Sequence, residues 1–160
     1  MKINRLLFKN KDYRVEDDID FSSIKTDPGH IKSIDKCHVL VTGNDYDDIL
    51  VLNFKIEAEV TGVCAYSLED VPLKIKSDVT LNFSYDEEDE DIIHIDNPIF
   101  EVDEIVYSLI ISEVPLKIVK KGAKLPDSGL GYRVLSEDEY QKEQDNKKDS
   151  RWSKLDDVEL

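Results

Sequence analysis

The stretch "LVLNFKIEAEV" (residues 50–60) decides the fold, because it alternates apolar and polar residues over eleven positions. Apolar side chains occupy every even position, and four of the five odd positions are polar or charged. A period of two is typical of a β-strand that has one buried face. The sequence therefore predicts a long strand here, with its even-numbered side chains in the core.

A second stretch, "VPLKIKSDVTLNF" (residues 71–83), repeats this pattern with apolar residues at odd positions. Only Ser77 interrupts its apolar face. Two long alternating stretches separated by a short polar connection favour an antiparallel pair. We expect the two strands to be neighbours in one sheet.

A shorter third strand is predicted at "CHVLVTG" (residues 37–43), with Cys37, Val39 and Val41 on one face. The turn-rich "GNDYDD" that follows predicts a hairpin into the strand that begins at Leu50. In this setting Cys37 is interpreted as a small buried hydrophobe.

One helix is predicted over residues 103–114, with Asp103 as its N-cap and Pro115 as its stop. The β-branched run "IVYSLII" leaves a strand open as the alternative. Together these elements predict an α+β fold. The sheet is expected to be mainly antiparallel and curved or barrel-like, with one packed helix.

The chain is divided into three regions by its composition. Residues 1–116 are expected to form the α+β core, and residues 117–135 a basic loop segment packed on it. Residues 136–160 form a polar tail, helical or disordered, that opens with a capping-box pattern from Ser136 to Glu139. The acidic stretch "DEEDED" (residues 86–91) is interpreted as a solvated loop.

Charge and cysteine content narrow the function classes. The formal net charge is −15, which opposes nonspecific binding to nucleic acid and suits docking onto a basic partner. The two cysteines and three histidines are scattered, so no metal cluster or cofactor is predicted. With no signal peptide and no membrane span in the sequence, we expect a cytoplasmic protein.

Cys64 is the residue that most invites a chemical role. A nucleophilic thiol needs a nearby base, yet the adjacent residues are Glu69 and Asp70, which are expected to raise its pKa. The position three residues further on is Ser67, whose hydroxyl is a poor zinc ligand. Packing is therefore the favoured interpretation, and no catalytic residue is assigned.

The segment after Leu116 is the one candidate RNA contact. It carries four lysines and no acid between positions 117 and 124, and with the basic residues of the N-terminus it could form a positive face. A solvated surface is the more common outcome for such runs. The four lysines are Lys117, Lys120, Lys121 and Lys124.

Three motifs, taken in order, resemble the YceD family of large ribosomal RNA subunit accumulation proteins. They read "VTGVCAYSLEDV", "IFEVDEIVYSLIISEVPL" and "DSRWSKL". The positions that carry the resemblance are Gly62, Cys64, Leu68, Glu69, Pro115, Leu116, Asp149, Arg151, Trp152 and Leu155. Many members have further cysteines where this chain has Ser67 and the cysteine-free segment 116–135, so metal binding is not carried over.

The resemblance implies a non-catalytic factor in large-subunit biogenesis that supports accumulation of 23S ribosomal RNA. A basic large-subunit ribosomal protein is then the expected partner, with ribosomal RNA as a second contact and neither DNA nor membrane involved. Two alternatives stay open. One is an acidic interaction module that binds a basic ribosomal protein without touching RNA; its tail could act as a short linear motif anchored by Trp152 and Leu155. The other is a nuclease or thiol hydrolase.

Overall fold

The computed structural model describes residues 1–9, 13–22, 24, 29–46, 48–85 and 91–146. Five strands form one sheet in the order β2-β3-β4-β5-β6, and a two-stranded β1-β7 ribbon adjoins it. The elements in chain order are β1 Lys2–Asn4, η1 Arg5–Phe8, β2 Tyr13–Asp18, β3 Ile31–Tyr46, β4 Ile49–Val63, β5 Asp70–Ser84, β6 Ile92–His94, β7 Ile99–Glu101, α1 Asp103–Glu113 and α2 Glu137–Asn146.

The long alternating stretches form β4 and β5, as predicted, and they pair antiparallel from Ile49↔Ser84 to Val63↔Asp70 without a register shift. Every even-numbered side chain of β4 from Leu50 to Val60 is buried. The α+β class is thus confirmed, with four antiparallel strands and only β6 parallel to its neighbour. The sheet is not closed into a barrel, because β2 and β6 end it on either side.

The predicted third strand lies inside β3, which is longer than the pattern indicated. Its buried residues are spaced by three at first and then by two: Ile31, Ile34, Cys37, Val39 and Val41. Two register shifts against β4, between Ile31/Ser33 and Ile34/Lys36, account for the wider spacing, because each bulge adds one residue. The hairpin from β3 into β4 is confirmed by the pair Tyr46↔Ile49.

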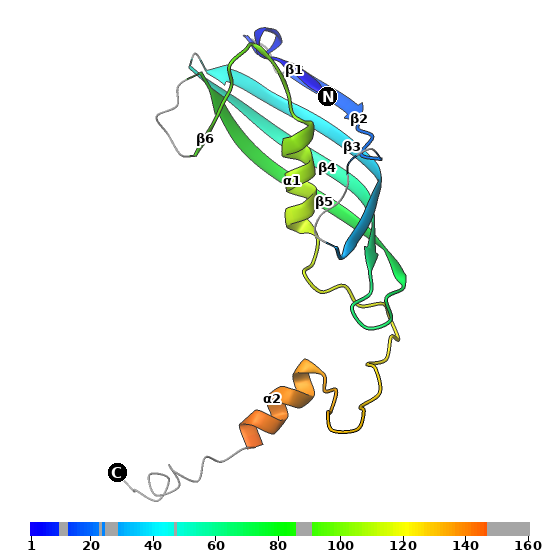
Figure 1. Ribbon diagram of the computed structural model, residues 1–160. Helices are drawn as coiled ribbons and strands as arrows, with labels where there is room; N and C mark the ends of the chain where they lie inside the picture. The colour runs from blue at the N-terminus through cyan, green and yellow to red at the C-terminus, as the bar shows by residue number, and fades with distance from the viewer. Residues whose placement is uncertain (10–12, 23, 25–28, 47, 86–90, 147–160) are drawn as a thin grey trace, which may run out of the picture.

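Helix α1 crosses one face of the sheet and buries Val106 and Ile110 (Figure 1). It begins one residue earlier than predicted: Val102 is the N-cap, and Asp103 lies in the first helical turn. The carboxylate of Asp103 instead pairs with the amino group of Met1. Asp103 also lies in the first turn, where its negative charge interacts favourably with the helix dipole. Pro115 follows the C-cap residue Val114 and ends the helix as predicted.

Helix α2 begins with the predicted capping box. The Glu139 N–H donates to Ser136 Oγ at 3.2 Å, and the Ser136 N–H donates to Glu139 Oε2 at 2.8 Å. Residues 137–145 of this helix are all exposed. No helix among the described residues has the length and hydropathy of a membrane span.

A buried ion pair fixes the N-terminal segment to the end of the β3–β4 hairpin. Arg5 Nη2 lies 2.7 Å from Asp45 Oδ1, and both side chains are at most 4% exposed. The guanidinium also lies 4.7 Å from the ring centroid of Tyr85. Because Arg5 is buried here, it cannot contribute to the positive face that the sequence suggested; Lys2 and Arg14 pair with Glu101 and Glu16.

We predict that Asp45→Asn lowers the free energy of unfolding by about 3 kcal/mol, because it removes the buried carboxylate that pairs with the guanidinium. Urea denaturation measures the change. Asp127→Asn is the matched control, since Asp127 is exposed, and it should stay within about 0.5 kcal/mol of the original chain. Equal effects of the two substitutions would contradict the role given to the pair.

Candidate functional site: the Cys64 corner and the open sheet face

Two segments far apart in sequence meet around Cys64, and we call them the Cys64 corner: residues 64–69, which join β4 to β5, and residues 116–120, which follow α1. The Ala65 N–H donates to the Ile118 carbonyl at 2.8 Å, so the segments are joined through their backbones. Leu68 has a φ of +58°, the left-handed conformation of a tight turn. The corner thus contains the middle of the first family-like motif and Leu116, the last residue of the second.

Gly62 makes this contact sterically feasible. A Cβ placed on Gly62 would lie 2.3 Å from Ile118 Cδ1 and 3.4 Å from Leu73 Cδ1. Ile118 is buried, so the missing side chain at position 62 is what lets residues 116–120 approach the sheet.

The thiol of Cys64 is buried and accepts hydrogen bonds from the backbone. Its Sγ lies 3.4 Å from the Lys120 nitrogen and 3.5 Å from the Ser67 nitrogen. These donors favour the thiolate, and they lower the pKa of Cys64 to about 7, with the Lys120 N–H contributing most and the Ser67 hydroxyl next. The expectation that Glu69 and Asp70 raise this pKa is wrong.

The reason lies in how Glu69 is used. Its carboxylate pairs with Lys120 Nζ at 3.1 Å and accepts from Ser67 Oγ at 3.0 Å, which lowers the pKa of Glu69 itself. A neutralised carboxylate exerts little repulsion on a neighbouring thiolate. Cys37 shows the opposite case, because burial raises its pKa to about 12. That fits the interpretation of Cys37 as a packing residue.

The remaining residues of the family-like motifs are either exposed or outside the described part of the chain. Leu68 and Leu116 are 77% and 92% exposed, although both were singled out by the family-like motifs. Asp149, Arg151, Trp152 and Leu155 lie outside the described residues, as does most of the acidic stretch 86–91.

The four candidate RNA-contacting lysines do not act as one group. Lys117 pairs with Glu137 at 3.1 Å and lies 5.3 Å from the ring centroid of Tyr66, and Lys120 pairs with Glu69. Lys121 and Lys124 are exposed and form no ion pair with any residue that the structure describes. Two of the four charges are therefore already compensated within the chain.

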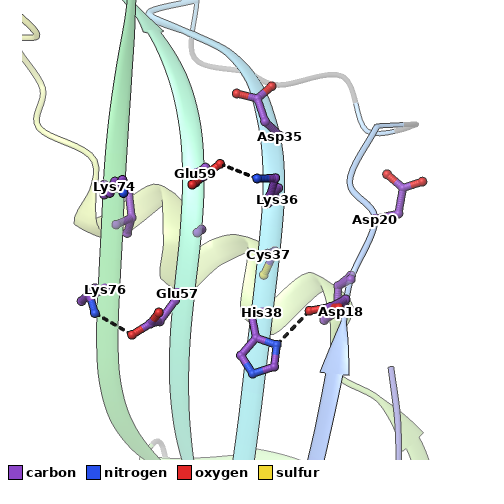
Figure 2. Close-up of a pocket in the computed structure, with 13 residues that line it drawn as sticks. Asp18, Asp20, Asp35, Lys36, Cys37, His38, Glu57, Glu59, Lys74 and Lys76 are labelled. Carbon is purple, nitrogen blue, oxygen red and sulfur yellow. Dashed lines mark hydrogen bonds and ion pairs between the residues drawn. The ribbon is translucent and has the colours of Figure 1, made fainter.

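The face of the sheet opposite α1 carries a charged hollow of about 530 Å³ (Figure 2). The acids of the central strand β4 pair with cations of the adjoining strands: Lys36 with Glu59 at 3.1 Å, and Lys76 with Glu57 at 2.6 Å. His38 Nδ1 lies 2.8 Å from Asp18 Oδ1, and this hydrogen bond raises the pKa of His38.

Three aspartates border this hollow and form an acidic rim: Asp18, Asp20 and Asp35 (Figure 2). All three are exposed, as is Asp17 next to Asp18 in the sequence. No group of three metal-binding side chains is present among the described residues. None of the four described hollows is lined by Cys64.

We expect Gly62→Ala to lower the free energy of unfolding by about 1 kcal/mol, because the new methyl group displaces Ile118 from the sheet. Urea denaturation tests this. The control is Gly29→Ala, where the added Cβ meets nothing within 4 Å. If the two glycines respond alike, the close approach of Ile118 is not what position 62 requires.

A second prediction concerns the thiol. In a Cys37→Ser background, thiolate absorbance should rise with an apparent pKa of about 7, well below that of an ordinary thiol. Because the pKa of Cys64 is lower in the folded state than in the unfolded chain, ionisation of this thiol stabilises the fold. The stabilisation is fully present above the ordinary thiol pKa and is lost as pH falls through about 7. Cys64→Ser should remove this part of the pH dependence. Titration at or above the ordinary value would contradict the donor arrangement.

A family model described as "Large ribosomal RNA subunit accumulation protein YceD" matches residues 52–159, which cover most of β4, β5, α1 and the tail. The searches of curated proteins and of solved structures each returned no match.

Proposed function

Because the chain belongs to the YceD family, we propose that it is a non-catalytic factor for biogenesis of the large ribosomal subunit, one that supports accumulation of large-subunit ribosomal RNA. The family description is the observation that carries this proposal. The match spans 108 of the 160 residues and includes both segments of the Cys64 corner.

The partner that fits the surface is a basic ribosomal protein. A net charge of −15 steers a cationic protein toward the chain and repels free phosphate backbones. The acidic rim offers a local docking point, because Asp18 and Asp20 project from the β2 end of the hollow (Figure 2). Contact with ribosomal RNA then occurs through the bound partner or through Lys121 and Lys124, which form no ion pair within the described part of the chain.

The thiol hydrolase alternative has one observation in its favour, the lowered pKa of Cys64. A nucleophile must also reach its substrate, and the Cys64 side chain is 0% exposed. The lowered pKa has a structural origin in the Lys120 N–H, which joins the two segments of the corner, and in the hydrogen bonds from Ser67. A positional role for Cys64 accounts for both the burial and the pKa.

We predict that the protein comigrates with precursors of the large subunit when a cell lysate is sedimented at low salt, and that high salt releases it. Depletion should lower the level of large-subunit ribosomal RNA relative to small-subunit RNA. A protein found only at the top of the gradient, together with unchanged RNA levels after depletion, would contradict the proposal.

Matched variants locate the contact. Asp18→Asn/Asp20→Asn/Asp35→Asn should weaken comigration severalfold, because it removes the three charges of the acidic rim. Asp127→Asn/Asp138→Asn/Asp145→Asn removes the same charge from exposed positions elsewhere and should have little effect. Cys64→Ser should preserve both comigration and RNA levels, whereas a loss of RNA accumulation with a normally folded variant would favour a catalytic thiol.

A further inference from the structure

Strand β5 leaves one side of the sheet open. Its other neighbour, β6, pairs only with Asn82, Phe83 and Ser84 (Figure 1). From Asp70 to Leu81, no strand among the described residues pairs with this side of β5. An open edge of this length presents a row of backbone donors and acceptors, which is the usual template for adding a further strand.

The contact with β6 shows which residues of β5 direct their backbone N–H and C=O groups toward the open edge. The Ser84 carbonyl accepts from the Ile95 N–H at 2.8 Å, so even-numbered residues direct their backbone groups away from β4. Pro72, which has no N–H, shares this parity, as expected for proline on an edge strand. The N–H groups of Lys74, Lys76, Asp78 and Thr80 have no hydrogen-bond partner among the described residues.

The sequence of this edge is complementary to itself when reversed about Ser77. Lys76 and Asp78 flank Ser77 on the solvent-facing side, and the next pair outward on that side is Lys74 and Thr80. On the core-facing side every position is apolar: Leu73 and Ile75 precede Ser77, and Val79 and Leu81 follow it. A reversed copy of the strand therefore places a base opposite an acid and apolar residues opposite apolar residues.

Ser77 provides an independent observation at the centre of this segment. It is 7% exposed, and its Oγ has no hydrogen-bond partner among the residues that the structure describes. A buried hydroxyl without a partner is unfavourable by about 1–3 kcal/mol. In an antiparallel pair of β5 strands centred on Ser77, the two hydroxyls face each other at the symmetry axis and can bond to one another.

We propose that two copies of the chain pair through β5, antiparallel, with a two-fold axis at Ser77. Lys76 then lies opposite the partner's Asp78, and the same contact recurs on the other side of the axis, as a two-fold interface requires. The paired stretch runs from Leu73 to Leu81, because β6 already occupies the edge beside Asn82, Phe83 and Ser84. Both α1 helices lie on the same face of the joined sheets.

The flank of α1 next to this edge adds apolar surface. Ile105 lines a small hollow together with Phe83 and Ile93, so this flank of the helix faces β5 and β6. Leu109 follows one turn later on the same flank, and both side chains are half-buried. Val71, Leu73, Val79 and Leu81 of β5 are also only partly buried. Pairing of the edges covers these side chains.

Lysine and proline on an edge strand also serve to keep an edge unpaired. What distinguishes a pairing edge is the self-complementary order of its charges, since protection alone does not require an acid two residues after the lysine. The proposal is independent of the role in ribosome biogenesis, because it rests on β5 alone.

Charge-swap variants test the register. The original chain should sediment at twice its 18.4 kDa mass in the micromolar range. Lys76→Asp places acids opposite acids, and Asp78→Lys places bases opposite bases, so each variant alone should have half the mass of the dimer. An equimolar mixture should recover the dimer, because each variant supplies the charge that the other lacks. Circular dichroism verifies that both variants fold.

Cross-linking tests the axis independently. Two cysteines at position 77 would face each other within disulfide reach, so Ser77→Cys should form an intermolecular disulfide under mild oxidation. Val79→Cys faces Ile75 of the partner subunit instead and should cross-link much more slowly. The proposal is overturned by a monomeric original chain, by folded charge-swap variants whose mixture stays monomeric, or by equally fast cross-linking at positions 77 and 79.

Discussion

The structure depends on the burial of the even-numbered side chains of β4. This strand is central in the sheet, with β3 and β5 paired along its whole length on either side. Leu50, Leu52 and Phe54 are fully buried, and α1 covers the same face through Val106 and Ile110. Paired residues on adjoining strands point to the same face of the sheet. The six buried side chains of β4 therefore determine which face of β3 and β5 is buried.

The sequence predicted the parts of this arrangement that depend on local period. β4, β5, α1 and the capping box of α2 follow from side-chain spacing within one element. The full length of β3 did not, because two bulges change its spacing from two to three and hide the strand from a pattern based on strict alternation. The barrel expectation was wrong, since closure depends on pairing between β2 and β6, which no local pattern encodes. The N-cap was misplaced because the Met1 amino group occupies the carboxylate of Asp103.

The candidate site was predicted less completely, because its contacts join residues that are far apart in the sequence. Cys64 and Gly62 were identified from their motif, but the lowered pKa of the thiol comes from a backbone N–H 56 residues away in sequence. No local sequence pattern predicts the partner of that thiol, and none predicts the buried pair of Arg5 and Asp45. Only the acidic neighbours of Cys64 were visible in the sequence. Glu69 is neutralised by Lys120, one of the candidate RNA-contacting lysines, and Asp70 by Lys32.

The charged side chains on the exposed face of the sheet also help to determine the register of β4 against β5. A slip of β4 against β5 by two residues would leave the buried face apolar, so hydrophobicity alone does not forbid it. The observed alignment sets Glu57 opposite Lys76 and Lys55 opposite Asp78. A slip in one direction brings Glu57 against Asp78, and a slip in the other brings Lys55 against Lys76. Like charges thus penalise both misalignments, and the exposed side of the sheet selects among pairings that its core would accept equally.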